Sequence, residues 1–373
     1  MKSFVISRGM PSNNYPLYGI FEFDQSKALA ECGVETTLLA IDFRSIAYKR
    51  KYGLFSYKKD GVKVFELSLP LGVYRRALPI LQSLLLFLYK KAVKKVGKPD
   101  VIHAHFYSIA AIASVIKRKK KIPFLITEHS SKLNKEAKLI SDLDKRLAIK
   151  AYSNADSIIA VSKSLSLNLK NNFGCDSVVI NNIVDTRNFK YVEHTNNQGF
   201  VFLSVGNLIP LKGFDILIKA FHKAFANEKD VFLHIAGDGP ERDNLQNIIN
   251  QYGIDNKVKL LGQKTRPELY DLMKKASAFV LASRSETFGL VYIEAMLSGL
   301  PVIATSCGGP EEFVNDDNGI LISVDDIDSL AEALIIMRQN ISKYNREKIS
   351  RECNERFSPQ SIANEIVRRY SEL

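Results

Sequence analysis

The segment SRSETFGLVYIEAMLSG, residues 283–299, places two carboxylates eight positions apart, Glu286 and Glu294. A helix is predicted to begin near Gly289 and to end at Gly299, since glycine commonly ends helices. At about 100° per residue, the apolar side chains of this helix cover most of its circumference. Glu294 is its only charge, and a buried carboxylate without partners is unfavourable. The hydroxyl groups of a ribose or another sugar would satisfy it by donating hydrogen bonds.

The turn before this helix, Thr287-Phe288-Gly289, supplies a second chemical feature. Its backbone N–H groups would be free at a helix N-terminus, a place that favours phosphate or developing negative charge. Glu286 stands beside that position. The competing interpretations are an ordinary loop acid at Glu286 and a helix-surface charge at Glu294.

Elements that could position these residues recur along the whole chain of 373 residues, a length that predicts two domains. Short β-branched runs alternate with helical patterns, as in βαβ units around a parallel sheet. The pattern restarts at Gly199, after the polar segment 185–199, so a second doubly wound sheet is expected. The predicted strand runs are SFVIS, ETTLLAI, VKVFEL, DVIHAHF, PFLITEH, SIIAVS and SVVIN, then FVFLSVG, VFLHIAG, KVKLLG, AFVLAS, PVIATS and GILISV.

The predicted domains are residues 1–190, residues 191–355, and a C-terminal helix at 356–373 that packs back on the first domain. Ligands of open parallel sheets bind at the carboxyl ends of the strands, which makes a cleft between two such domains the expected site. Neither half contains G-x-G-x-x-G or G-x-x-x-x-G-K-[ST], so the usual dinucleotide and triphosphate fingerprints are missing.

Composition excludes several classes of protein. With 46% hydrophobic and 25% charged residues the chain is neither disordered nor of low complexity. Its four cysteines form no C-x-x-C pair, which argues against a disulfide framework and a zinc site and favours a reducing cytoplasm. No run is long enough to span a membrane, and the N-terminus has no signal-peptide pattern. Cytoplasmic localisation is therefore expected.

Positive charge is concentrated in the first half. Residues 1–190 hold 32 lysines and arginines against 15 acids, whereas the remainder holds 20 against 25. The segments 75–98 and 117–121 combine basic residues with apolar ones. They predict peripheral contact with anionic lipid at the inner face of the membrane, with an ordinary solvated surface as the alternative. Nucleic acid is not expected, because no aromatic-interleaved basic motif is present.

Several motifs, in a fixed order, carry a resemblance. The sequence S-x-x-E-x-F-G-L-x-x-x-E-A-x-x-x-G-x-P-V-I-A is joined by ADSIIAVS, VGNLIPLKGFDILIKAF, HIAGDGPER and GGPEEF. Together they resemble the retaining family-4 glycosyltransferases (glycosyl transferases group 1). The resemblance implies the GT-B fold, which is two Rossmann-like doubly wound domains facing a central cleft. It also implies an acceptor-binding first domain and a nucleotide-sugar-binding second domain.

The resemblance also implies roles for individual residues. Glu286 would contact the hydroxyls of the donated sugar, Glu294 would hold the ribose, and Lys212 would meet the diphosphate. Asn207 stands where many relatives carry a second diphosphate-binding arginine, so the chain departs from the pattern there. Gly308 and Gly309 would let the backbone approach the donor. The predicted catalytic residues are His129 and Glu286; the predicted donor-binding residues are Asn207, Lys212, Gly237, Glu286, Phe288, Gly289, Leu290 and Glu294; and Arg8, Gly19 and His105 are expected on the acceptor or phosphate side.

The implied reaction transfers a sugar from a UDP-sugar or GDP-sugar to a hydroxyl acceptor with retention and without a metal ion or other cofactor. A saccharide or lipid-linked saccharide of a polysaccharide or lipopolysaccharide pathway is the expected acceptor. A sugar-nucleotide epimerase, a glycosidase and a non-catalytic nucleotide-sugar-binding protein are the alternatives. Asp142-Leu143-Asp144 and Asp326-Ile327-Asp328 imitate a metal-binding D-x-D. The first lies in a charged helical run, and the second opens a predicted helix, where acids favour the N-terminus.

Overall fold

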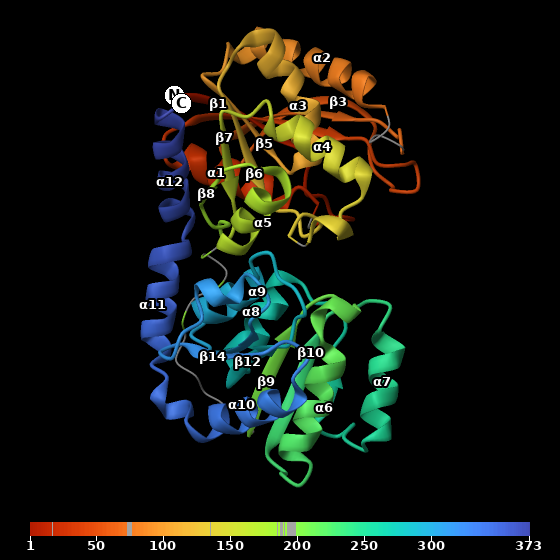
Figure 1. Cartoon of the computed structure of the whole chain (residues 1–373), viewed down its shortest axis with the longest axis vertical. Helices are drawn as coiled ribbons and strands as arrows, with labels where there is room; N and C mark the ends of the chain where they lie inside the picture. The colour runs from red at the N-terminus through yellow and green to blue at the C-terminus, as the bar shows by residue number, and fades with distance from the viewer. Residues whose placement is uncertain are drawn as a thin grey trace. The chain divides into compact units, whose positions relative to one another are not determined.

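A computed structural model describes residues 1–16, 18–72, 77–134, 136–184, 186, 189, 191 and 199–373. The chain divides into two compact units (Figure 1). Unit 1 comprises Met1–Ile183 together with Pro359–Leu373, and unit 2 comprises Val184–Ser358. The C-terminal helix therefore belongs to the first unit. The acceptor-binding and donor-binding roles assigned to the two domains stay predictions.

Unit 1 contains an eight-stranded sheet in the order β3-β4-β2-β1-β5-β6-β7-β8, parallel except for β3, which pairs antiparallel with β4. Its strands are β1 Lys2–Ser7, β2 Glu35–Asp42, β3 Gly53–Lys59, β4 Val62–Ser68, β5 Val101–His105, β6 Phe124–Glu128, β7 Ser157–Ala160 and β8 Val178–Val179. Its α-helices are α1 Ile20–Glu31, α2 Leu78–Val96, α3 Tyr107–Lys120, α4 Asp142–Tyr152, α5 Lys163–Phe173 and α12 Pro359–Ser371.

Unit 2 contains a six-stranded, wholly parallel sheet in the order β11-β10-β9-β12-β13-β14. Its strands are β9 Phe200–Val205, β10 Val231–Ala236, β11 Val258–Leu260, β12 Ala278–Leu281, β13 Val302–Thr305 and β14 Gly319–Ile322. Its α-helices are α6 Phe214–Phe225, α7 Arg242–Gln251, α8 Arg266–Lys275, α9 Leu290–Leu297, α10 Ile327–Gln339 and α11 Arg346–Phe357.

Each of the predicted strand runs contains a strand, because buried parallel strands read as continuous β-branched runs. Strand β3 was missed. It forms a hairpin with β4 through Asp60 and Gly61, which have φ of 44° and 82°. An Asp-Gly pair between two alternating segments is a signal for this type of turn. The sequence therefore held the information that the prediction overlooked.

The core of unit 1 joins the two ends of the chain. Helix α12 packs against α1, as Figure 1 shows, and both lie over the sheet. Ile362, Ile366 and Tyr370 of α12 are at most 4% exposed and share a cluster with Leu29 of α1. Burial of that apolar face explains why a helix following unit 2 in sequence belongs to unit 1.

Candidate active site

The centre of the unit 2 sheet is a topological switch point. Strands β9 and β12 are neighbours there, but the chain proceeds from β9 toward one edge of the sheet and from β12 toward the other. The loops after two such strands diverge and leave space at their carboxyl ends, where ligands of open α/β sheets bind. Lys212 follows β9 and Glu286 follows β12. The two residues singled out from sequence therefore come from the two loops that border this space.

Lys212 and Glu286 form an ion pair in which Lys212 Nζ lies 2.6 Å from Glu286 Oε1. Ser283 Oγ donates to the same carboxylate oxygen at 2.7 Å. The side chains of Lys212 and Glu286 are 20% and 10% exposed, so the pair is mostly withdrawn from water yet still reachable. A cation and a carboxylate thus lie side by side at the expected ligand position.

Arg284 holds the segment that carries Lys212 and was not singled out from the sequence. Its guanidinium donates to Asp215 Oδ2 at 2.9 Å, to Asp325 Oδ1 at 2.7 Å and to the carbonyl of Pro210, which opens the short 3₁₀ turn Pro210–Lys212. These contacts tie the loops after β9 and β12 together. An arginine of this kind gives no sequence signal, because its partners lie about 40 and 70 residues away.

The backbone around Glu286 is fixed by the next loop. The Glu286 N–H donates to the carbonyl of Cys307 at 3.1 Å, and Glu286 forms a bridge with Gly308. A Cβ on Gly309 would lie 2.2 Å from the carbonyl oxygen of Phe288, so only glycine allows this approach. Phe288 itself is buried. Gly309 therefore lets two backbone segments meet directly, next to the bridge between Glu286 and Gly308.

Helix α9 begins after Gly289, which has φ of 93°, and the C-cap is Ser298. Five of its eight residues are buried, as predicted. Glu294 is only half-buried, however, and so is Leu290 one turn earlier. The expectation of a fully buried Glu294 was wrong, because Leu290, Val291 and Glu294 form one strip that is partly open to solvent. Because Leu290 and Val291 are apolar, the helical projection did not indicate that this strip is partly exposed.

Asn207 and Gly237 lie near the carboxyl ends of β9 and β10. Asn207 is exposed and directly follows Gly206. Gly237 has φ of 148°, and a Cβ there would lie 1.8 Å from the carbonyl oxygen of Gly206. Close backbone packing is thus the structural reason for glycine at 237, whatever the ligand.

Unit 1 has its own switch point between β1 and β5. Arg8 follows β1, and its Nε lies 3.2 Å from Oε1 of Glu22, a residue of α1 that is wholly buried. Burial raises the pKa of Glu22, with the Arg8 charge acting in the opposite direction. Gly19 is the N-cap of α1, and a Cβ there would lie 2.2 Å from the carbonyl oxygen of Gly9. The backbone at Gly19 thus packs directly against Gly9, the residue after Arg8.

Three histidines stack next to Arg8 at the ends of β5 and β6. The ring centroids of His103 and His105 are 4.8 Å apart, and those of His105 and His129 are 5.1 Å apart. His103 and His105 are wholly buried, whereas His129 is partly exposed. Burial lowers the pKa of His103 and of His129 to about 3, and lowers that of His105 well below its usual value. All three imidazoles are therefore neutral at physiological pH.

Phe106 lies between the two polar groups of this region. The Arg8 guanidinium lies over its ring at 4.2 Å, and the ring is 4.9 Å from that of His129. Phe106 has φ of 63° and ψ of 137°, an unfavourable backbone conformation for a bulky residue. Such strain is typical of functional sites.

The two D-x-D sequences have structural roles. Asp144 accepts hydrogen bonds from the hydroxyls of Tyr107 at 2.5 Å and Ser141 at 2.7 Å. Asp326 caps α10 by accepting from the Ser329 N–H at 2.9 Å. Within the described part of the chain, no group of three or more His, Cys, Asp or Glu residues is arranged to hold a metal ion.

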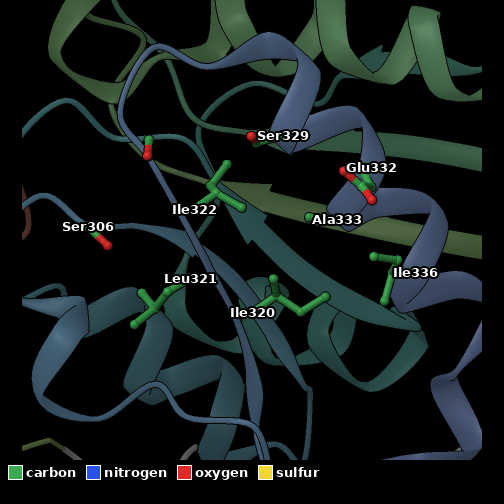
Figure 2. Close-up of a pocket in the computed structure, with 9 residues that line it drawn as sticks. Ser306, Ile320, Leu321, Ile322, Ser329, Glu332, Ala333 and Ile336 are labelled. Carbon is green, nitrogen blue, oxygen red and sulfur yellow. The ribbon is translucent and has the colours of Figure 1, made fainter.

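A pocket of about 370 Å³ lies elsewhere in unit 2, between β14 and α10 (Figure 2). Ile320, Ile322 and Ile336 line it together with Ser329 and Glu332. Its lining has no cation and includes none of the predicted donor-binding residues. It therefore does not suit a diphosphate.

Comparisons with known proteins agree with this fold. The family described as Glycosyltransferase Family 4 matches residues 23–188, and Glycosyl transferases group 1 matches residues 185–351. An uncharacterized glycosyltransferase of Methanocaldococcus jannaschii is 33% identical over 280 residues, which are 74% of this chain and 76% of that protein. TuaC of Bacillus subtilis, a glycosyltransferase assigned to teichuronic acid biosynthesis, is 28% identical over 94% of this chain and 90% of its own.

Among solved structures, HepE of Anabaena in complex with UDP covers all of both chains with a TM-score of 0.75 at 22% identity. Its complex with UDP-glucose matches at a TM-score of 0.74. Two doubly wound parallel-sheet domains of this kind define the GT-B class of glycosyltransferases, which confirms the predicted fold. The chain belongs to the family-4-type glycosyltransferases of that class.

Proposed function

We propose that this glycosyltransferase transfers a sugar from a UDP-sugar to a hydroxyl acceptor with retention at the anomeric carbon. The observation that carries the proposal is the 2.6 Å pair of Lys212 and Glu286 beside the N-terminus of α9. A nucleotide sugar presents an anionic diphosphate next to sugar hydroxyls that donate hydrogen bonds. A cation beside a carboxylate matches that order of groups. The UDP and UDP-glucose complexes of HepE favour uridine over guanosine.

In this proposal the donor separates the two charges of the ion pair. Lys212 and the N-terminus of α9 stabilise the negative charge that develops on the leaving diphosphate. Glu286 accepts from the hydroxyls of the donated sugar and remains oriented by Ser283. Glu294, on the half-exposed strip of α9, binds the ribose. Gly237, Phe288, Gly289 and Leu290 shape the donor site. Arg8, Gly19 and His105 belong to the acceptor or phosphate side, and His129 lies near the transferred sugar.

The acceptor is a saccharide or a lipid-linked saccharide of a cell-surface polysaccharide. The relationship to TuaC, assigned to teichuronic acid biosynthesis, supports this class. A direct test incubates the protein with UDP-glucose, UDP-galactose, UDP-N-acetylglucosamine or GDP-mannose and with lipid-linked saccharides extracted from bacterial membranes. Mass spectrometry of the extract should show the addition of one sugar from a UDP-linked donor, and proton NMR should show an unchanged anomeric configuration.

Three results would contradict the proposal. Conversion of the donor to its epimer without acceptor would indicate an epimerase, and saturable donor binding without turnover would indicate a binding protein. Inversion at the anomeric carbon would exclude the retaining mechanism. Transfer should also persist in EDTA, since Lys212 and a helix N-terminus are proposed to stabilise the diphosphate; complete loss of transfer that magnesium restores would overturn that part.

We also propose peripheral contact of unit 1 with anionic lipid through α2. Ile80 and Phe87 are 61% and 46% exposed and seven residues apart, which places them on one face of the helix. Exposed Lys90, Lys91 and Lys94 continue that face. Apolar side chains next to cations are typical of helices that bind the membrane interface. No helix within the described residues is both long and apolar enough to cross a bilayer.

Vesicle sedimentation tests this contact. The protein should bind vesicles containing phosphatidylglycerol more than vesicles of phosphatidylcholine alone, and binding should weaken as salt is raised. The double variant Lys90→Gln/Lys94→Gln should bind less than Lys229→Gln/Lys259→Gln, a matched control on exposed lysines of unit 2. Equal binding of the two double variants would contradict the proposal.

A further inference from the structure

The three stacked histidines belong to a continuous hydrogen-bonded chain inside unit 1. His129 Nδ1 lies 2.8 Å from Asn182 Oδ1, and His129 Nε2 lies 2.8 Å from His105 Nδ1. His105 Nε2 lies 3.3 Å from the side-chain amide nitrogen of Gln25. Both ring nitrogens of His129 are therefore occupied by protein groups.

The chemistry of the end groups fixes the direction of these bonds. An amide oxygen can only accept, so His129 Nδ1 carries the hydrogen that bonds to Asn182. A neutral imidazole has one hydrogen, hence His129 Nε2 accepts from His105 Nδ1. By the same reasoning His105 Nε2 accepts, and the amide nitrogen of Gln25 donates to it.

The other end of the chain is consistent with this direction. The Gln25 amide has two hydrogens, and its nitrogen also lies 3.2 Å from His103 Nδ1. Tyr370 of α12 places its hydroxyl 2.7 Å from that same nitrogen. His103 Nδ1 is then an acceptor, and His103 Nε2 donates to Thr127 Oγ1 at 2.7 Å. The Gln25 amide thus donates to His105 and shares His103 Nδ1 with the nearer hydroxyl of Tyr370.

The surroundings hold the His129 ring in place. Phe21 stacks on it with an interplanar angle of 14°, and Phe106 contacts it at a centroid distance of 4.9 Å. The Arg8 charge opposes protonation of His129, as burial does. Rotation of the ring would break two hydrogen bonds and the stacking contacts with Phe21 and His105.

We propose that Gln25 and His105 are positioning residues that hold His129 as the neutral Nδ1–H tautomer, so that His129 orients the transferred sugar and does not exchange a proton with it. The role in transfer rests on the proposed function, but the tautomer does not. With both nitrogens occupied, the ring contacts the sugar through its carbon edge and face. The acceptor proton then leaves to the departing diphosphate and not to a histidine.

The tautomer can be measured directly without substrate. The protein is labelled with ¹⁵N-histidine, and long-range ¹H–¹⁵N spectra are recorded from pH 8 to 5.5, with each of the six histidines assigned by its own His→Gln variant. His105 and His129 should each carry one hydrogen, on Nδ1, across this range. An Nε2–H tautomer, an averaged signal or an imidazolium at His129 would overturn the proposal.

Gln25 offers two variants of nearly equal size that separate positioning from packing. The carboxylate of Gln25→Glu accepts a hydrogen bond from His105 Nε2, which reverses the direction of the hydrogen bonds in the chain. His129 should then change to the Nε2–H tautomer. In kinetics, kcat should fall at least tenfold, while the KM for the donor should stay within about twofold of the wild-type value. Gln25→Met removes the donor without reversing the chain, and the His129 signal should average between tautomers. The control Gln82→Met alters a buried glutamine that donates to the Ala111 carbonyl outside the chain and should leave the spectrum unchanged.

These outcomes distinguish the two proposals. An Nδ1–H tautomer at His129 in a protein that fails to transfer sugar would reject the proposed function and keep the hydrogen-bonded chain. Active enzyme in which Gln25→Glu reverses the tautomer and kcat stays unchanged would reject the positioning role.

Discussion

At the scale of single residues, the ion pair of Lys212 and Glu286 offers a ligand a cation and a carboxylate at the same place. The side chains of Lys212 and Glu286 are 20% and 10% exposed, and the Ser283 hydroxyl also donates a hydrogen bond to the carboxylate. In this environment a hydrogen bond to a charged group contributes about 1.5 to 3 kcal/mol. Each partner is therefore expected to have a measurable and separable effect on donor binding.

Lys212→Ala should weaken binding of UDP by about 10- to 150-fold, because it removes one charge-assisted contact. Asn207→Arg should preserve or strengthen binding, since Asn207 is exposed and a longer side chain has room there. Calorimetry with UDP measures both. An unchanged dissociation constant for Lys212→Ala would refute its phosphate role, and weaker binding by Asn207→Arg would show that the site needs a small residue at 207.

Glu286→Gln should lower turnover much more than affinity for UDP, because UDP lacks the sugar that Glu286 is proposed to bind. Glu294→Gln should weaken affinity for UDP itself through the ribose. Calorimetry and steady-state kinetics on both variants test the distinction, with Glu332→Gln on α10 as a control on an exposed helix acid away from the proposed donor site. Equal dissociation constants for Glu286→Gln and Glu294→Gln would contradict the separate roles.

At the scale of elements, the site depends on loops that follow adjacent central strands. Arg284 joins the loops after β9 and β12, and Tyr292 of α9 donates through its hydroxyl to the carbonyl of Leu281 at the end of β12 at 2.8 Å. Helix α12 has the corresponding role in unit 1, since Tyr370 contacts His103 and the apolar residues of α12 cover α1.

Ile366→Ala should destabilise unit 1 by about 2 to 5 kcal/mol, because Ile366 is 1% exposed and truncation leaves a cavity. Arg368→Ala, at an exposed position of the same helix, should change stability by less than about 0.5 kcal/mol. Hydrogen exchange measured in increasing urea on peptides of α1 and of unit 2 separates the two units. Equal loss of protection in both units would show that α12 stabilises more than unit 1.

At the scale of the whole molecule, charge and protonation differ between the two halves of the chain. Basic residues exceed acids in residues 1–190, whereas acids exceed basic residues in the remainder. Four titratable residues of unit 1 are completely buried: His103, His105, Glu22 and Glu128. These buried groups make the stability of unit 1 depend on pH.

Replacing His103 by glutamine should reduce the loss of unit 1 stability on acidification. Burial lowers the pKa of His103 to about 3, so the unfolded chain binds a proton below about pH 6.5 that the folded chain does not. Stability contributed by neutral His103 is therefore present above pH 6.5 and lost as pH falls toward 3, by about 2 kcal/mol between pH 7 and 5. Burial raises the pKa of Glu128 to about 6, so Glu128 makes unit 1 more stable as the pH falls from about 6 to 4.5. This contribution is the same in wild type and His103→Gln.

The measurement compares urea unfolding of unit 1 in wild type and His103→Gln at pH 7, 6 and 5. Hydrogen exchange of the β5 backbone amides monitors the unfolding. The difference between their free energies of unfolding should narrow or change sign as pH falls. Parallel pH dependence in the two proteins would show that His103 is protonated in the folded state.

The sequence by itself predicted the family and the described strands other than β3, and it singled out Lys212 and Glu286 as candidates, because buried parallel strands and short motifs are local in the chain. It misjudged Glu294, since a helical projection does not reveal which apolar side chains a neighbouring element covers. It also missed Ser283, although a serine three residues before a glutamate is a recognisable local pattern. Gln25, Asn182 and Arg284 gave no local signal. Only the tertiary structure decided their contacts, because hydrogen bonds across 53 to 80 residues depend on which strands become neighbours in the sheet.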